Sequence, residues 1–230
     1  MEKLEEYLLQ TGQVDETDSR LLRQIAYERL QDAMRHANLQ PGEPLSETRI
    51  SKALGISRTP VREALQQLAQ EGLVQIIPGR AVTVAAPSMQ EVLDAIHVRQ
   101  LLEPELVRLV TEMLPANAVD TLQAIIRDME QAARIDDRAA WSKADSLFHE
   151  TLSHYCPNRL LGQLVLQARN RVHQSTIDDQ TSAARVLDYT EEHSHIARAI
   201  LARDSQTAER LVREHIERLR QSMFKRLARY

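Results

Sequence analysis

The stretch GISRTPVREALQQLAQEGLV, residues 55–74, decides how the amino-terminal part of this chain folds. Five of its apolar residues fall on one stripe of a helix that begins at about residue 59: Val61, Ala64, Leu65, Leu68 and Ala69. Arg58, Arg62 and Gln66 recur every fourth residue on the other side. A solvated face needs no such row of long hydrogen-bond donors, because acidic residues would serve it equally well. The pattern therefore indicates that the two arginines have a binding partner, which remains to be identified from the rest of the sequence.

The neighbouring segments predict the other helices of a small domain. An amphipathic helix is expected over residues 22–34, and Ser46 is placed to cap a short second helix. Gly55 then makes a tight turn into a third helix, which has Pro60 in its first turn, where a missing amide costs little. Gly72 ends this third helix.

A two-stranded hairpin is predicted next, because β-branched runs stand on either side of PGR, residues 78–80. Two helices, a tight turn, a third helix and such a wing make a winged helix-turn-helix, whose third helix enters the DNA major groove. There the guanidinium forks of Arg58 and Arg62 can each bond guanine O6 and N7 together. Ser57 and Thr59 are short donors suited to phosphates.

These motifs strongly resemble the DNA-binding domain of GntR-family bacterial transcription regulators. The resemblance spans about residues 21–86 and is carried by SRTPVREAL, then L..EGLV, then a Pro-Gly wing. It implies DNA contacts from the start of the second helix, the start of the recognition helix and the wing: Glu47, Thr48, Ser57, Arg58, Thr59, Arg62, Gly79 and Arg80. Many members have an arginine where Thr48 stands, whereas here Arg49 is offset by one position.

The placement of glycine divides the chain. Four of the six glycines lie between residues 42 and 79, whereas Gly162 is the only one after residue 86. We expect a turn-rich DNA-binding domain over 21–86 and an all-helical bundle of about six helices over 87–230. Residues 1–20 form an N-terminal extension, in which LEEYLL is compatible with a short helix. The expected fold class is therefore mostly α, with a winged helix-turn-helix followed by a helical bundle.

The composition excludes several classes of protein. No apolar run reaches the roughly 18 residues of a membrane span, and the first ten residues carry three glutamates, unlike a secretory signal. We therefore expect a cytoplasmic protein with no membrane partner. The single cysteine, Cys156, excludes an internal disulfide framework. The net charge is −4, but residues 21–86 hold eight basic and six acidic residues, which leaves room for a basic face.

Polar residues on the expected inner faces of the bundle suggest a metal site. Asp145 and His149 are four residues apart and share one helical face. Either His193 or His195 near the start of a later helix, and His215 on the last helix, offer further imidazoles. A carboxylate and three imidazoles from three helices can hold one divalent cation in a bundle. An Asp–His pair at this spacing is also common as a surface hydrogen bond, so the spacing alone leaves both readings open.

The arrangement resembles the FCD ligand-binding domain, the all-helical partner in the FadR-type branch of GntR regulators. That domain commonly shows Asp-x-x-x-His, then Glu-His near a helix start, then a histidine 22 residues later, and Glu192–His193 fits the second element. The resemblance selects His193 over His195. It implies one divalent metal ion per chain, zinc first and nickel or manganese as alternatives. The implied ligands are Asp145, His149, His193 and His215.

Arg99 and Glu103 stand one turn apart, like the Arg-x-x-x-Glu of the first FCD helix. In that family the arginine lies over the ligand cavity, so the resemblance implies that Arg99 anchors an effector. A guanidinium beside a metal would clamp a small carboxylate. The alternative is an intrahelical ion pair that contributes only a few tenths of a kcal/mol.

The leading hypothesis is a metabolite-responsive transcriptional regulator rather than an enzyme, which binds a near-palindromic operator in double-stranded DNA as a homodimer. Two alternatives compete with it. One is a metal-dependent hydrolase with Glu150 or Glu192 as general base, although neither spacing forms a known catalytic motif. The other is a constitutive DNA-binding protein whose metal is purely structural.

Overall fold

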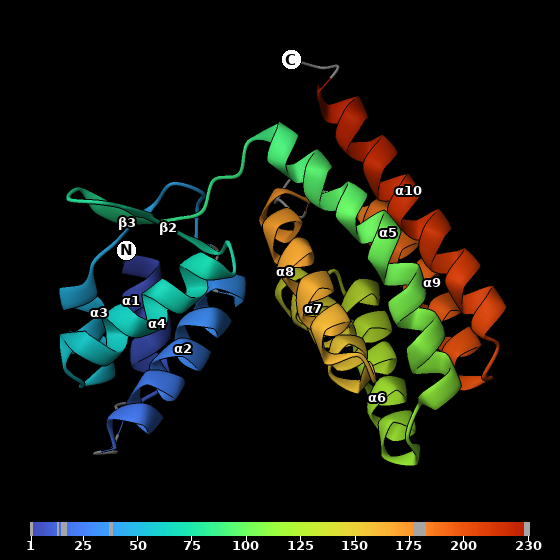
Figure 1. Ribbon diagram of the computed structural model, residues 1–230, viewed down its shortest axis with the longest axis horizontal. Helices are drawn as coiled ribbons and strands as arrows, with labels where there is room; N and C mark the ends of the chain where they lie inside the picture. Colours follow the sequence, from blue (N-terminus) through green and yellow to red (C-terminus); the bar gives the residue numbers. More distant parts are fainter. Residues whose placement is uncertain (1, 13, 15–17, 37–38, 177–182, 228–230) are drawn as a thin grey trace. The chain divides into compact units, whose positions relative to one another are not determined.

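A computed structural model describes residues 2–12, 14, 18–36, 39–176 and 183–227. The chain divides into two compact units, Met1–Ala86 and Pro87–Tyr230. The first is a winged helix-turn-helix unit and the second is helical, so the expected fold class is confirmed (Figure 1). No helix among the described residues is long and apolar enough to cross a membrane.

The amino-terminal unit is built on a helical core. Its described elements are α1 (Glu2–Gln10), α2 (Ser19–His36), β1 (Pro44–Leu45), α3 (Glu47–Leu54), α4 (Arg58–Gln70), β2 (Val74–Ile77) and β3 (Ala81–Val84). Helices α2, α3 and α4 meet through fully buried side chains that include Leu30, Ile50 and Leu68. Ser46 caps α3, because its hydroxyl accepts a bond from the Arg49 amide at 3.3 Å. Gly55 adopts φ 72°, a left-handed conformation that lets the chain turn into α4.

The sheet has one strand more than the predicted hairpin. Its order is β1–β3–β2, and both neighbouring pairs are antiparallel. The short strand β1 pairs Pro44 with Thr83 and Leu45 with Val82. A proline is tolerated there because β1 is an edge strand and needs no further ladder donor. The exposed wing tip lies between β2 and β3, where Gly79 has φ 69°.

The N-terminal extension is a structural part of this unit. Leu4 and Leu8 of α1 are fully buried and belong to the same hydrophobic core as α2, α3 and α4. The Val14 amide donates to the Leu54 carbonyl at 3.0 Å, which ties the following segment to the end of α3. Helix α1 therefore adds apolar packing to the three-helix pattern that the sequence predicts.

The second unit consists of long helices. Its described elements are α5 (Met89–Met113), α6 (Ala116–Arg134), α7 (Arg138–Tyr155), α8 (Arg159–Thr176), α9 (Ala183–Leu201) and α10 (Ser205–Leu227). The sequence predicts six helices with approximate cores at residues 89–113, 116–134, 138–155, 158–176, 187–203 and 205–227, and the observed bounds lie close to these except for α9. Helix α9 begins earlier than the expected residue 187 and ends before Arg203, whose φ of 60° breaks the helix.

Side chains form hydrogen bonds with the unpaired backbone groups at both ends of α5. Ser88 and Glu91 form a reciprocal capping box at the start of α5. The helix continues past Pro104 and ends at Met113. The Arg203 guanidinium donates to the carbonyls of Thr111 and Leu114 and so compensates the unpaired acceptors at the end of α5.

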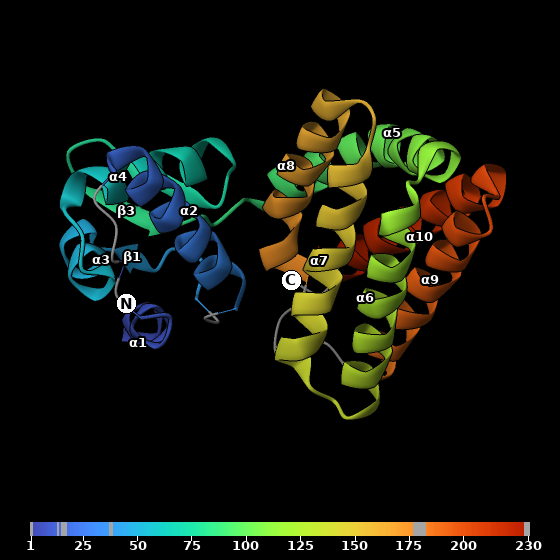
Figure 2. The same cartoon turned by 90° about the horizontal axis from the view of Figure 1, so that it is seen from below.

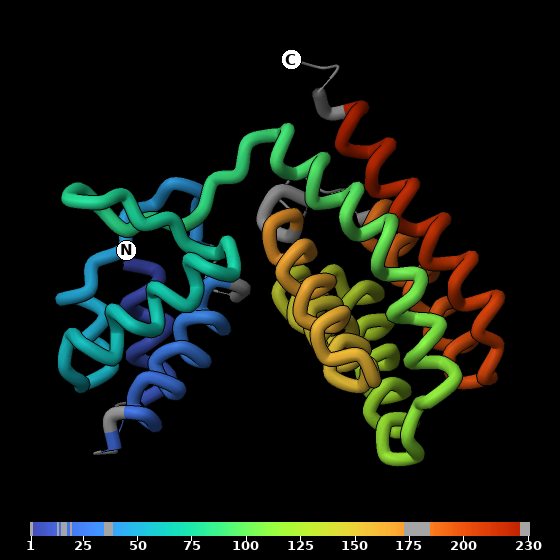
Figure 3. The backbone as a smooth tube through the Cα atoms, in the orientation of Figure 1, coloured from blue at the N-terminus to red at the C-terminus, as the bar shows by residue number. Residues whose placement is uncertain are grey.

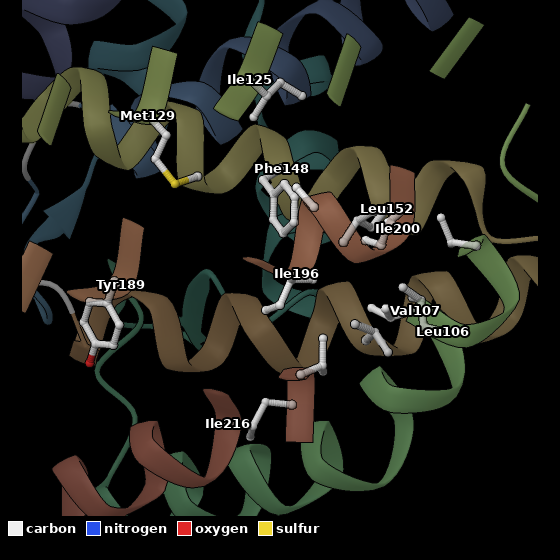
Figure 4. Packing of buried hydrophobic residues seen from close by; sticks show 14 of the residues in the cluster. Leu106, Val107, Ile125, Met129, Phe148, Leu152, Tyr189, Ile196, Ile200 and Ile216 are labelled. Carbon is white, nitrogen blue, oxygen red and sulfur yellow. The ribbon is translucent and has the colours of Figure 1, made fainter. Parts of the chain in front are cut away.

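The bundle packs its helices in a fixed set of pairs. Helix α5 packs against α8 and α10, whereas α6 packs against α7 and α9, as Figures 2 and 3 show. Figure 4 shows apolar side chains from several of these helices meeting in the centre, among them Leu106, Phe148, Ile196 and Ile216.

Gly162 sets the separation of α7 and α8. A Cβ atom at residue 162 would lie 2.5 Å from the backbone oxygen of Ser153, closer than real contacts allow. The two backbones therefore approach each other at a point where no side chain fits. Because Asp145 and His149 are on α7 and Arg169 is on α8, this contact also fixes the spacing of the helices that carry them.

Candidate DNA interface and metal centre

The two arginines of the recognition helix both contact Glu47. The Arg62 Nε and Nη2 atoms donate to the two Glu47 carboxylate oxygens at 3.0 and 2.9 Å. The Arg58 Nη2 atom donates to the same carboxylate at 3.1 Å. Hydrogen bonding from Arg62, supported by Arg58, lowers the pKa of Glu47. The first turn of α3 thus holds both guanidinium groups at the start of α4 while leaving them largely exposed.

The other predicted DNA-contact residues are exposed to solvent. Thr48, Ser57 and Thr59 are exposed at the starts of α3 and α4, and Ser57 makes no side-chain capping bond. Gly79 and Arg80 are exposed at the wing tip. Sequence reasoning treats Glu47 as a contact residue, whereas its geometry here is that of a group that positions two others.

The helical unit brings three of the four predicted metal ligands together. Asp145 Oδ1 lies 3.2 Å from His193 Nε2 and 3.6 Å from His149 Nε2. The two Nε2 atoms are 3.1 Å apart. The fourth residue, His215, stacks edge-on against His193 with 4.8 Å between ring centroids. His195 is exposed, as the choice of His193 requires.

The outer ring nitrogens of two histidines are already held. His193 Nδ1 lies 2.7 Å from the Tyr189 carbonyl, and His215 Nδ1 lies 2.6 Å from Glu192 Oε2. Because a carbonyl or carboxylate accepts the Nδ1 proton, each ring is fixed with Nε2 as its electron-pair donor. Such outer partners are typical of metal-binding histidines.

The electrostatics of the cluster favour the metal-binding protonation states. Burial and the nearby Arg169 lower the pKa of His149 to about 3, and burial lowers that of His215. Burial opposes ionisation of Asp145, but Arg169, His149 and His193 overcome it and hold its pKa well below the usual range. At neutral pH the site therefore offers the carboxylate of Asp145 and the neutral imidazoles of His149 and His215.

Arg169 is a residue of this site that sequence reasoning missed. Its guanidinium donates to Asp145 Oδ2, and both residues are buried. The contact leaves Oδ1 of the same carboxylate toward the histidines. The available signal is a charged residue on the apolar stripe of α8 formed by Val165, Ala168 and Val172.

The residues present fit a divalent cation. Ligand atoms that share one cation at bonds of about 2.0–2.2 Å stand roughly 3.0–3.5 Å apart. Two of the three separations, 3.1 and 3.2 Å, fall in this range, and the third, 3.6 Å, lies just above it. Only Asp145, His149 and His193 form such a cluster among the described residues. Three imidazoles and a carboxylate suit zinc, nickel or manganese. His215 on α10, the fourth predicted ligand, lies outside this three-residue cluster, although its ring packs against that of His193.

Arg99 forms an ion pair with Glu103 beside this cluster. Arg99 Nε donates to Glu103 Oε1 at 2.6 Å, and both residues are buried. Burial is the main cause that lowers the pKa of His215, and Arg99 adds to it, which places the guanidinium near the histidines. Burial opposes ionisation of Glu103, but Arg99 and His149 keep its pKa below the ordinary value.

A small cavity adjoins the cluster. Its lining includes Glu103, Phe148, His149, Val165, Val212 and His215. About 20 Å³ of it is open to the centres of water molecules, enough for one or two waters. A carboxylate effector would therefore need some of these side chains to move, and Arg99 would have to exchange Glu103 for the ligand.

Comparisons with known proteins agree with this architecture. Residues 22–84 match the bacterial regulatory proteins of the gntR family, and residues 94–218 match the FCD domain. The two matches cover the winged helix-turn-helix and the helical unit that carries the histidine cluster. The chain belongs to the GntR family of transcriptional regulators, in the group with an FCD domain, and this family consists of regulators rather than enzymes.

Individual relatives share most of the chain. It is 27% identical over 191 residues to the HTH-type transcriptional repressor RspR of Escherichia coli (strain K12), covering 82% of each chain. It is 28% identical over 210 residues to a probable D-xylose utilization operon transcriptional repressor of Paenarthrobacter nicotinovorans, covering 88% and 91%. The solved structure of E. coli McbR/YncC has the same fold, with a TM-score of 0.77, 22% identity and coverage of 90% and 98%.

We predict that the purified protein carries about one divalent cation per chain and that His149→Ala abolishes binding. The change removes an Nε2 donor from the cluster, while the apolar core keeps the bundle folded. Metal analysis would measure the content and circular dichroism the helicity.

The matched control is His195→Ala, which removes an exposed imidazole from the same helix as His193. It should leave the metal content unchanged. Wild-type protein that stays metal-free after resupply with zinc, nickel and manganese would contradict the assignment of the four ligands.

Proposed function

We propose that this regulator responds to a metabolite and binds a near-palindromic operator as a homodimer. A small carboxylate bound beside a divalent metal ion in the helical unit modulates its DNA binding. The observation that carries this proposal is the buried donor cluster of Asp145, His149 and His193, with Arg99 nearby, in a chain that also has an intact winged helix-turn-helix. A protein that meets chromosomal DNA acts in the cytoplasm.

The paired arginines support base reading by α4. Because Glu47 binds both guanidinium groups in the absence of DNA, their forks are already ordered before a duplex arrives. Ordering in advance reduces the side-chain entropy lost on binding. We infer that Arg58 and Arg62 bond guanine edges, while Ser57, Thr59 and the wing residue Arg80 bind the DNA backbone.

An exposed apolar face supports the homodimer. Val98 and Leu101 of α5 are 41% and 64% exposed, and Leu160 and Leu164 of α8 are 63% and 42% exposed. A cluster of this kind on a folded protein marks an interaction site. We name these four residues the α5/α8 patch.

The crossing of the two helices makes the α5/α8 patch continuous. Arg171 helps to lower the pKa of Glu91, and Glu105 and Arg159 both act on the Cys156 thiol. The start of α5 therefore lies near the end of α8, and the middle of α5 near the start of α8, so the two helices are antiparallel. Because α5 packs against α8, the two pairs of exposed residues lie on neighbouring helices. We assign the patch to a second copy of the chain, because an operator with two half-sites needs two reading heads.

The Arg99–Glu103 pair supports an acidic effector. Two positive centres, the guanidinium and the metal, would face one cavity if a ligand replaced Glu103 on Arg99. A mono- or dicarboxylate would neutralise them, whereas a neutral ligand would leave charge uncompensated in a poorly solvated site. When bound, the metal would supply an additional attraction for the carboxylate oxygens. Coupling to DNA requires only that the effector prefer one arrangement of the reading heads by about 1–3 kcal/mol.

The first test concerns the recognition helix. Arg62→Ala should weaken binding to an operator selected from a random duplex pool by about 1–3 kcal/mol, because one bidentate guanine contact is lost. Binding to random DNA should change much less. Arg23→Ala, which removes an exposed arginine from α2, is the control for loss of positive charge. An equal loss on both duplexes would assign Arg62 to phosphate instead.

The second test concerns the dimer. Leu101→Glu should convert the protein to monomers, because two like charges would be buried in a symmetric interface. Sedimentation would measure the oligomeric state. Ile135→Glu is the control, since Ile135 is also 64% exposed but lies after α6, outside the α5/α8 patch. A variant of Leu101 that sediments like the wild type would rule out this face.

The third test concerns the effector. In a thermal-shift screen of metal-loaded protein against organic acids, sugars, amines and nucleosides, acids should raise the thermal midpoint, because a ligand that binds the folded state stabilises it. Arg99→Lys should weaken this response, since lysine lacks the planar fork. Glu103→Gln should strengthen it, because the competing carboxylate is removed.

Several outcomes would overturn the effector assignment. If only sugars stabilise the protein in the screen, the effector is a neutral ligand rather than an acid. A wild-type response of Arg99→Lys would exclude Arg99 as the anchor. An acid that binds without changing operator affinity would favour the constitutive DNA-binding protein with a structural metal.

A further inference from the structure

Helix α1 lies outside both family matches, which begin at residue 22 and at residue 94. Its position is fixed by burial of Leu4 and Leu8 in the core of the amino-terminal unit. It packs against α3 and α2. The polar side of α1 is therefore held in a defined place beside α3.

A glutamate on that polar side forms an ion pair with an arginine of α3. Arg49 Nε and Nη2 donate to the two carboxylate oxygens of Glu5. This bidentate ion pair joins residues on two different helices that are 44 positions apart in the sequence. The attraction of Glu2 adds to that of Glu5 and helps to raise the pKa of Arg49. Hydrogen bonding to Arg49 lowers the pKa of Glu5, so the carboxylate is ionised at neutral pH.

Arg49 occupies a position from which it could reach DNA. It follows Glu47 by two residues in the first turn of α3, and Glu47 binds the arginines of the recognition helix. Arg49 and its neighbour Thr48 are both exposed. An arginine at the start of a helix that borders the DNA interface is suited to a phosphate contact, which carries no sequence information.

We propose that Glu5 holds Arg49 away from DNA phosphates and thereby lowers the sequence-independent affinity of the protein for DNA. The pair is neutral as it stands, and a phosphate would have to displace a bidentate carboxylate to bind Arg49. Glu2 and Glu6 on the same helix add negative charge that repels the backbone. The result is one phosphate contact fewer on every sequence, which weakens binding to operator and random DNA alike and leaves the base-reading contacts of Arg58 and Arg62 unchanged.

The salt dependence of binding to a short random-sequence duplex tests this proposal with the full-length protein. Each phosphate contact contributes about 0.9 to the slope of log K against log salt concentration. Glu5→Gln should therefore steepen the slope by about 0.9 for each Arg49 released, and it should raise affinity at low salt. Arg49→Gln alone should leave the slope unchanged, and the double variant Glu5→Gln/Arg49→Gln should return it to the wild-type value.

Glu6→Gln is the matched control, because it removes the same charge from the same helix at an exposed position. It should leave the slope unchanged. The proposal fails if Glu5→Gln is no steeper than Glu6→Gln, or if Arg49→Gln alone flattens the slope, since Arg49 would then contact phosphate in the wild type. The second criterion does not depend on Glu5→Gln keeping α1 in place.

This inference rests on the proposed DNA-binding function, but the two can fail separately. Wild-type protein that binds no duplex at any salt concentration would overturn DNA binding itself. If the wild-type protein binds DNA and Arg49→Gln flattens its salt-dependence slope, only the role of Glu5 would be overturned.

Discussion

The ion pair between Arg169 and Asp145 is the interaction on which the helical unit depends. Both groups are buried, and leaving either one without its partner in such a place would cost about 3–5 kcal/mol. The pair joins α8 to α7 and orients the Asp145 carboxylate, whose second oxygen faces His149 and His193. The same positive charge helps to keep His149 neutral. One contact thus fixes both the direction of a carboxylate and the protonation state of its neighbour.

Carboxylates also organise the arginines of the amino-terminal unit. Glu47 binds Arg58 and Arg62 where α3 meets α4, and Glu5 binds Arg49 where α1 meets α3. In our proposals the two acids differ by their position. Glu47 lies on α3 beside the recognition helix and keeps two guanidinium groups there, whereas Glu5 lies on α1 and holds Arg49 toward that helix. The affinity of such a surface for DNA depends on how many cations are available rather than on how many are present.

Local patterns in the sequence predicted most of the fold. Ser46, Gly55 and Gly72 mark helix ends by their own backbone chemistry, and the long helices of the second unit have apolar stripes that define their extent. The two-residue strand β1 could not be predicted in this way, because it exists only through pairing with β3. The role of α1 was missed for a similar reason, since Leu4 and Leu8 are buried by residues that follow much later in the chain.

The residues of the candidate site also fall into two groups, those that the sequence predicts and those that only helix packing brings together. Asp145 and His149 share a helix turn, so their proximity follows from spacing, and the resemblance to the FCD domain supplied His193 and His215. Arg169 comes from another helix, and no spacing rule connects it to Asp145 across 24 residues. The pairing of Arg49 with Glu5 is equally non-local. Contacts that depend on how helices pack require the three-dimensional structure.

The close approach of α7 and α8 at Gly162 gives the helical unit a mechanical property. With the Ser153 oxygen only 2.5 Å from where a Cβ would stand, the two backbones touch directly and no flexible side chain lies between them to absorb a displacement. A shift of either helix is therefore passed to the other as a rigid movement. Asp145 and Arg169 lie on these two helices, so a displacement of the ion pair moves α7 and α8 together as one body.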